Sequence, residues 1–198
     1  MVFKDSKTPR LNRTESPIFK LARSYLQVRN NELHTRNAIK FAFRLLTIYG
    51  ADRVVVIPAL ILHDVGWSKV SEDIIKKTRR PFPDKSLLRI HEEESLKIAS
   101  DILKKVGYDA SRTAEILEII DGHDSRGEAM SINDQIVQDS DKLTRYAGSF
   151  RFLNRQLPMT PEEFVKSLER LIDQWFFLPD SKEMARAELV QRRMEIGS

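Results

Sequence analysis

Apolar residues recur along most of the chain at intervals of three and four, the spacing of amphipathic helices, whereas the alternating pattern of strands is hard to find. Gly50 and Gly107 follow two of these periodic stretches, and glycine readily adopts the left-handed backbone that ends a helix. The fold class that this pattern predicts is all-α. The expected helices cover residues 16–29, 30–49, 51–66, 86–106, 110–122 and 131–146, followed by one that begins at Thr160 and one over 180–194.

The polar stretches between these helices indicate how the chain is organised. Residues 1–14 are charged and show no period, so we expect a flexible N-terminal arm. Residues 68–86 turn polar, which predicts a short helix and a loop of the kind that covers a site. With 198 residues, 41% of them apolar, the chain can bury one sizeable core. We therefore predict one compact helical domain over 15–150, with C-terminal helices over 151–198 packed on the same domain.

Composition and charge narrow the classes of function. The chain has no cysteine, which excludes disulfides and thiolate metal sites and leaves carboxylate, imidazole and water as metal ligands. Its 33 basic and 29 acidic residues give a net charge of +4, which suits a small anionic ligand but not a nucleic-acid partner. The longest apolar run, residues 54–62, is too short to cross a bilayer, and the polar N-terminus does not resemble a signal peptide. We expect a cytoplasmic protein without a nucleic-acid or membrane partner.

The placement of histidine is the most informative chemical feature of the sequence. Asp64 directly follows a histidine at the end of the most apolar predicted helix, and Asp141 also lies on an inward face. A buried carboxylate is costly unless it is paired or binds a cation, and a divalent metal resolves that cost. A lone inward histidine is usually a hydrogen-bonded core residue, but that explanation would have to hold four times. The chain has four histidines, and each lies among apolar neighbours on a predicted helix: His34, His63, His91 and His123.

This ordered set of histidines and aspartates resembles the HD superfamily of metal-dependent phosphohydrolases over about residues 30–147. The strings LILHDVG, IHEEESLKIASDILKKVGY and DSDKL carry the resemblance. It implies one or two divalent ions as cofactor, among Fe, Mn, Mg, Co and Ni. The implied ligands of the primary ion are His34, His63, Asp64 and Asp141; His91 and His123 match the additional histidines of the dinuclear members, in which Asp64 would bridge both ions.

The sequence departs from the family pattern soon after the His-Asp pair. Trp67 stands where the family often has lysine, and Lys69 follows two residues later. The GYP signature of cyclic-dinucleotide phosphodiesterases is absent, which argues against that class of substrate.

The resemblance implies hydrolysis by a metal-bound water, whose pKa the ion lowers toward neutrality. Asp64 is the residue expected to orient this water or to accept its proton. Arg126, Arg145 and Lys69 are the cations expected to hold the substrate phosphate, and Lys142 is a weaker candidate. The alternative for each of these cations is an ordinary solvated surface charge.

Other acidic residues are expected to be less important. Glu92, Glu93 and Glu94 are predicted to be solvated helix surface, and only Glu94 is expected to be able to reach back to a ligand histidine. Asp124 and Asp139 are predicted to be exposed surface carboxylates.

The predicted substrate is a nucleotide or a dinucleoside polyphosphate, because the string GHDSRG before the last aspartate resembles the diadenosine tetraphosphate hydrolases of the superfamily. Two alternatives stay open: a di-iron oxygenase of the same superfamily acting on a small polar substrate, and a non-catalytic nucleotide-sensing module. The apolar cluster over residues 175–177 either packs in the core, which we favour, or forms a homodimer contact.

Overall fold

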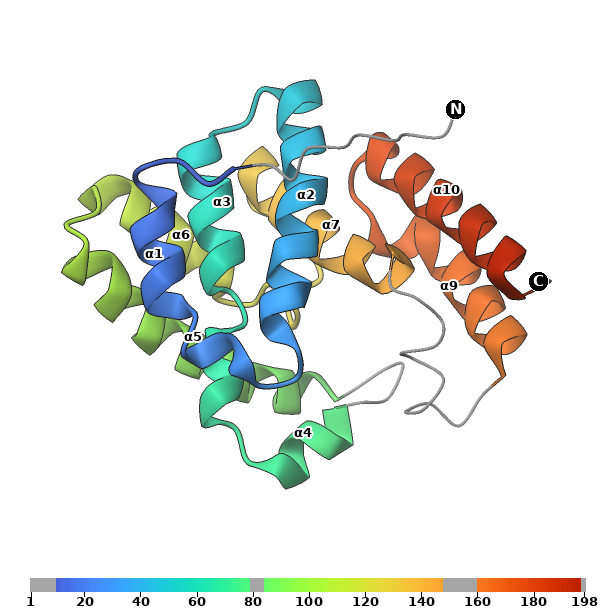
Figure 1. Cartoon of the computed structure of the whole chain (residues 1–198), viewed down its shortest axis with the longest axis horizontal. Coiled ribbons are helices and arrows are strands. Elements are labelled where there is room, and N and C mark those ends of the chain that lie inside the picture. The colour runs from blue at the N-terminus through green and yellow to red at the C-terminus, as the bar shows by residue number, and fades with distance from the viewer. Residues whose placement is uncertain (1–9, 79–83, 148–159, 197–198) are drawn as a thin grey trace.

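The computed structural model describes residues 10–78, 84–147 and 160–196. Within these ranges the regular structure is helical and no strand occurs, which confirms the all-α prediction. Residues 1–9 of the predicted 1–14 arm and residues 79–83 of the predicted 68–86 segment lie outside the described residues. The elements, labelled in Figure 1, are α1 (Glu15–Ala22), η1 (Tyr25–Gln27), α2 (Asn31–Tyr49), α3 (Arg53–Leu62), η2 (Val65–Lys69), α4 (Glu72–Thr78), α5 (Lys85–Lys105), α6 (Ala110–Ile120), α7 (Ile132–Ala147), α9 (Pro161–Trp175) and α10 (Pro179–Ile196).

Local sequence accounts for most of the helix ends. The carboxylates of Asp52, Asp84 and Asp109 accept hydrogen bonds from backbone N–H groups of the first turns of α3, α5 and α6. Thr160 forms a capping box with Glu163 at the start of α9. At the other end of α2, and just beyond α5, Gly50 and Gly107 adopt positive φ angles, as predicted.

Two predicted helices are shorter in the structure than the apolar pattern indicated. The helix expected over 16–29 ends at Ala22, and Arg29 and Asn30 turn the chain into α2 with φ angles of 54° and 60°. The helix expected over 51–66 ends at Leu62, and the chain continues through the separate 3₁₀ helix η2. Both errors have one cause, because a 3₁₀ turn buries apolar residues at nearly the same spacing as an α-helix.

The hydrophobic core surrounds α3. Residues Val55–Leu62 are almost completely buried, and α1, α2, α6 and α7 all contact this helix. Figure 1 shows α1, α2 and α7 beside α3, with α5 and α6 completing the bundle. The C-terminal end of α3 therefore lies in a region from which water is largely excluded.

The C-terminal helices share the same core. Figure 1 shows α9 and α10 as an antiparallel pair beside the end of α7. The buried Tyr146 of α7 donates a hydrogen bond to the Leu168 carbonyl oxygen, and its ring lies 5.3 Å from that of Phe176. Arg192 of α10 donates to the Tyr146 carbonyl oxygen. Phe176 is buried here, so it packs in the core, whereas its neighbours Trp175 and Phe177 are only half-buried.

Among the described residues, no helix combines the length and the apolar character needed to cross a membrane.

Candidate metal centre

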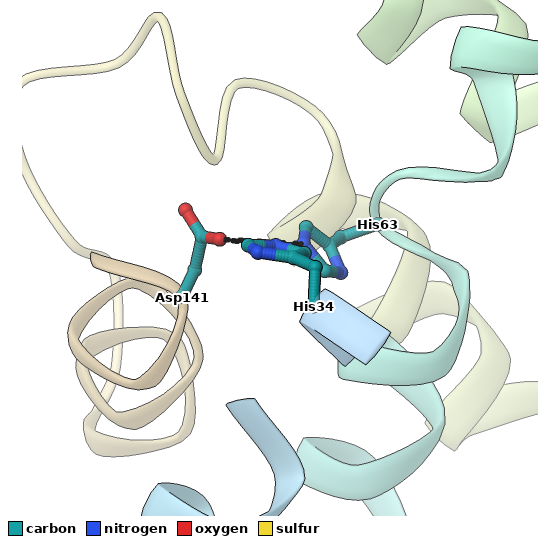
Figure 2. A group of neighbouring side chains, drawn as sticks. All are labelled: His34, His63 and Asp141. Atoms are coloured by element: carbon teal, nitrogen blue, oxygen red, sulfur yellow. Dashed lines mark hydrogen bonds and ion pairs between the residues drawn. The ribbon is translucent and has the colours of Figure 1, made fainter. Parts of the chain in front are cut away.

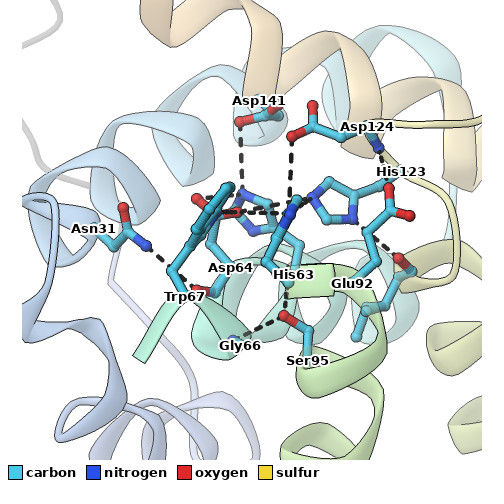
Figure 3. Close-up of polar contacts among 12 residues, drawn as sticks. Asn31, His63, Asp64, Gly66, Trp67, Glu92, Ser95, His123, Asp124 and Asp141 are labelled. Atoms are coloured by element: carbon cyan, nitrogen blue, oxygen red, sulfur yellow. Dashed lines mark hydrogen bonds and ion pairs between the residues drawn. The ribbon is translucent and has the colours of Figure 1, made fainter. Parts of the chain in front are cut away.

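Six side chains that are far apart in the sequence converge at the end of α3. His63 is the C-cap of this helix and is completely buried, and Asp64 follows it before η2 begins. Figure 3 shows this His-Asp pair at the centre of a network of polar contacts. The six residues are His34 from α2, His63 and Asp64 at the end of α3, His91 from α5, His123 after α6, and Asp141 from α7.

The first group of ligand atoms comes from His34, His63 and Asp141. Figure 2 shows the three side chains pointing toward one another. His34 Nε2 lies 2.8 Å from Asp141 Oδ1 and 3.2 Å from His63 Nε2, and the distance from His63 Nε2 to the same Asp141 oxygen is 3.5 Å. These atoms are close enough together to bind one metal ion.

The second group comes from His91, His123 and Asp124. The Nε2 atoms of the two histidines are 3.4 Å apart, and Asp124 Oδ2 lies 3.8 Å from His91 Nε2. These three residues also offer ligand atoms to a common point. Asp124 was predicted to be an exposed surface carboxylate, but its side chain is half-buried beside the two imidazoles.

Asp64 lies between the two groups, with one carboxylate oxygen toward each. Its Oδ2 atom is 3.5 Å from His34 Nε2 and 3.6 Å from His63 Nε2. Its Oδ1 atom is 3.5 Å from His91 Nε2 and 3.8 Å from His123 Nε2. This is the arrangement that a carboxylate bridging two cations requires.

Backbone carbonyl groups fix the protonation of two of the imidazoles. His63 Nδ1 lies 2.8 Å from the Leu60 carbonyl oxygen, and His123 Nδ1 lies 2.9 Å from that of Ile120. Because a carbonyl oxygen can only accept, each Nδ1 atom carries the proton. In a neutral ring this leaves Nε2 with a bare lone pair directed into the cluster.

The converging lone pairs require a positive charge. The Nε2 atoms of His34 and His63 face each other at 3.2 Å, and both also face carboxylate oxygens. Lone pairs at such distances repel unless a proton or a metal ion lies between them. Neutral imidazole together with ionised carboxylate is a donor set for first-row divalent metals, so these residues fit the ion that the sequence predicted.

Electrostatics within the cluster are strongly coupled. Burial alone would raise the pKa of Asp64, but the charge of His63 and a hydrogen bond with His123 outweigh it and hold this pKa well below its usual range. Burial opposes protonation of His123, yet Asp64 and Asp124 raise the pKa of His123 to about 10. Burial and the charge of His123 lower the pKa of His91 to about 4. Where no other cation is bound, protonated imidazole thus balances the carboxylates.

Hydrogen bonds from neighbouring elements hold the backbone of the His-Asp pair. The Ser95 hydroxyl of α5 donates to the His63 carbonyl oxygen at 2.6 Å and accepts from the Gly66 N–H at 2.8 Å. The Asn31 side-chain amide donates to the Asp64 carbonyl oxygen at 3.3 Å. The pair is therefore fixed from both α2 and α5.

Glu92 holds the turn that carries His123. It was predicted to be a solvated surface residue, but it is completely buried. Its carboxylate accepts hydrogen bonds from the backbone N–H groups of Asp124 and Ser125, both at 2.9 Å, and from the Ser125 hydroxyl at 2.7 Å. Glu94, the member of the acidic trio that we expected to contribute, instead pairs with Lys97 at the surface.

The three predicted phosphate-binding cations, Arg126, Lys69 and Arg145, have different surroundings in the structure. The Arg126 guanidinium pairs with Asp134 at 2.7 Å and donates to the Asp121 carbonyl oxygen, so it closes the turn before α7 and is not directed at the cluster. Lys69 is exposed at the end of η2. Arg145 is half-buried, and its charge acts on His34.

Some residues around the site were missed because the helical pattern gives no signal for them. Asp139 was predicted to be exposed, yet it is buried and accepts hydrogen bonds from the backbone N–H groups of Phe177 and Leu178. The hydrogen bonds of Ser95 with His63 and Gly66 likewise have no counterpart in the apolar spacing.

Comparison with known proteins places the chain in a family. The family model for the HD domain matches residues 32–146, a range that includes all six converging residues. A similar solved structure, that of a predicted HD superfamily hydrolase from an uncultured Thermotogales bacterium, has a TM-score of 0.57 and 20% identity over 92% of each chain, which shows a common fold. No curated protein matches at a significant level. The matched range and the arrangement of its histidines and aspartates show that the chain belongs to the HD domain family.

Proposed function

We propose that the protein is a metal-dependent phosphohydrolase that cleaves a phosphate ester or anhydride in a small anionic substrate, a nucleotide or a dinucleoside polyphosphate. The observation that carries the proposal is the convergence of four imidazole Nε2 atoms on Asp64 and Asp141. Membership of the HD domain family supports the same class of chemistry.

His34, His63, Asp64 and Asp141 would hold the first ion, and His91 and His123 a second, with Asp64 between them. Bound divalent ions would supply a water of lowered pKa and neutralise charge on the phosphoryl oxygens. Asp64 keeps its negative charge at neutral pH because its pKa lies well below the usual range, although burial opposes this. The ionised carboxylate can therefore orient a water by accepting a hydrogen bond from it.

We infer that two cations of α7 would hold the substrate phosphate. Lys142 follows Asp141 directly, and its Nζ atom lies 3.2 Å from the Trp175 carbonyl oxygen and 5.0 Å from the centre of the Phe177 ring. Arg145 lies one turn further, with its guanidinium carbon 5.2 Å from the centre of the Trp175 ring. The end of α9 and the residue Phe177 after it thus contact both cations, which are close in sequence to Asp141.

The first experiment is metal analysis of the purified protein after loading with Mn²⁺. We expect His63→Ala and Asp141→Ala to lose bound metal, since each removes a ligand from the first group. Glu72→Ala, which changes a carboxylate with 90% side-chain exposure on α4, is the control and should bind as the parent does. Unchanged metal content in both ligand variants would refute the assignment.

The second experiment is a phosphate-release screen over nucleotides and dinucleoside polyphosphates. On a substrate found this way, Arg145→Ala should lower kcat/KM about 10- to 100-fold, the equivalent of one charged hydrogen bond. Arg186→Ala on α10 removes an exposed arginine that pairs with Asp173 and Glu183, and should have no effect. Metal binding without phosphate release from any substrate would contradict the proposed reaction.

The placement of Asp64, with one carboxylate oxygen toward each pair of histidines, would also suit a site for two iron ions and so supports the oxygenase alternative. Substrate-dependent oxygen consumption by the iron-loaded protein would favour this alternative. Phosphate release with Mn²⁺ under argon would favour the hydrolase.

A further inference from the structure

Trp67 is a buried aromatic residue in direct contact with two of the converging side chains. Its indole stacks on the His91 imidazole, with ring centres 4.1 Å apart and an interplanar angle of 11°. Its Nε1 atom lies 3.0 Å from Asp64 Oδ1. With an exposed fraction of only 2%, the indole cannot contact a substrate, so its role must concern the residues around it.

The hydrogen bond from Trp67 fixes the orientation of the Asp64 carboxylate. An indole N–H is only a donor, so Nε1 must donate to Oδ1. Oδ1 is the oxygen that faces His91 and His123, and Oδ2 then faces the other pair. Rotation of the carboxylate away from this orientation would break the hydrogen bond.

The stacking contact supports a histidine whose Nδ1 atom has no hydrogen bond in the described part of the chain. His34, His63 and His123 each place Nδ1 within hydrogen-bond distance of a protein oxygen. His91 Nδ1 is buried and has no hydrogen-bond partner among the described residues. The nearly parallel indole of Trp67 therefore supports the face of this imidazole, while the His123 ring contacts it nearly at a right angle.

The local sequence places Trp67 with little freedom. A Cβ atom on Gly66 would lie 2.0 Å from the His91 carbonyl oxygen and 2.4 Å from the Ser95 nitrogen, so only glycine permits this approach of η2 to α5. The hydrogen bond from Gly66 to Ser95 holds the two elements together. The Arg29 guanidinium carbon also lies over the indole, 3.8 Å from its centre. Trp67 is thus enclosed by neighbouring side chains and backbone.

We infer that Trp67 is a positioning residue for the metal centre: it orients the Asp64 carboxylate between the two groups of ligands and holds the His91 ring for metal binding. This inference rests on the proposed metal site and adds to it a residue that stands where the family often has lysine. Partners of this kind typically contribute 10- to 100-fold to metal affinity, because they restrict the ligands to the binding orientation.

The test replaces the indole N–H while keeping the shape of the side chain. Benzothienylalanine at position 67 has sulfur in place of the N–H group, so it preserves stacking and loses the hydrogen bond to Asp64. We expect Mn²⁺ affinity, measured by calorimetric titration, to fall about tenfold, while the unfolding midpoint in EDTA stays near that of the parent. A purely structural role for Trp67 would move the unfolding midpoint and leave the affinity unchanged.

Two further variants complete the test. Trp67→Phe keeps an aromatic ring and should also bind Mn²⁺ about tenfold more weakly. Tyr108→Phe removes an aromatic hydroxyl that donates to the Val54 carbonyl oxygen and has no part in the cluster, so this control should bind Mn²⁺ as the parent does. If both position-67 variants bound Mn²⁺ as tightly as the parent protein, the inference about Trp67 would be refuted and the proposed function would be unaffected. Failure of the parent protein itself to bind Mn²⁺ would overturn the inference and the proposed function together.

Discussion

The imidazoles of the cluster are oriented mainly by groups that are not themselves metal ligands. The Leu60 and Ile120 carbonyl oxygens accept from His63 and His123, and an indole stacks on His91. The two carbonyl groups lie three positions before the histidines they orient, whereas the indole of Trp67 reaches His91 from a different element. A helix that ends at the histidine provides such a carbonyl without any special side chain.

At the residue scale, Glu92 is expected to contribute more than Glu94 to the free energy of unfolding. Glu92→Ala leaves the N–H groups of Asp124 and Ser125 without their acceptor in a buried turn, and should reduce the free energy of unfolding by about 2–3 kcal/mol. Urea denaturation in EDTA measures this effect without a contribution from bound metal. The matched control is Glu94→Ala on the same helix, where an exposed ion pair with Lys97 is lost and about 0.5 kcal/mol or less is expected. Equal effects of the two substitutions would show that Glu92 does not hold the turn.

The burial of Glu92 could not be predicted from the apolar spacing of α5. A residue one position after His91 points about 100° away around the helix, so it was assigned to the solvent face. The structure covers both faces, because η2 packs on one side of α5 and the turn after α6 lies against the other. The periodicity of one helix cannot indicate how many neighbours it has.

At the scale of elements, the contact between η2 and α5 sets the position of Asp64 relative to His91. Gly66 lies against the backbone of α5, and Ser95 joins the two elements through both of its hydrogen-bonding roles. The length of α5 and its inward His91 were predicted correctly from the apolar spacing. The short 3₁₀ helix was not, because its residues were assigned to the end of α3.

Gly66→Ala tests this contact. The added Cβ would meet backbone atoms that cannot move aside, so the free energy of unfolding should fall by about 3 kcal/mol or more. Gly127→Ala is the control, since no atom lies within 4 Å of the position of its Cβ. Thermal unfolding of the two variants measures the difference. Similar midpoints for both would mean that η2 does not approach α5 this closely.

At the scale of the whole molecule, the C-terminal helices complete the core on which α7 rests. Leu168 and Leu189 belong to the same buried cluster as the residues of α3. The amphipathic spacing predicted these helices, and packing on the same domain was the expectation. Their contact with Tyr146 and Asp139 was not foreseen, because it depends on hydrogen bonds between segments about 20 to 40 residues apart in the chain.

Leu168→Ala should therefore destabilise the entire chain and not only α9. We expect a loss of about 2–5 kcal/mol in the free energy of unfolding, with a single transition by circular dichroism and by tryptophan fluorescence. Leu33→Ala, at a position on α2 that is 59% exposed, should change it by about 0.5 kcal/mol or less. Two separate transitions in the parent protein would contradict a shared core.

The convergence of the four histidines with Asp64 and Asp141 is the part of the site that sequence order predicted best. Histidines on separate helices can be assigned to a common centre because their inward faces must meet in one core. The position of the Asp64 carboxylate, less than 4 Å from all four imidazole Nε2 atoms, depends on side-chain orientation, which periodicity does not define.

The most direct measurement is an anomalous difference map from crystals of the protein soaked in Mn²⁺. It should show an ion within about 2.0–2.3 Å of the Nε2 atoms of His34 and His63 and of an Asp141 oxygen. An ion bound elsewhere on the chain, or an absence of anomalous density among these atoms at saturating Mn²⁺, would contradict a metal centre at the end of α3.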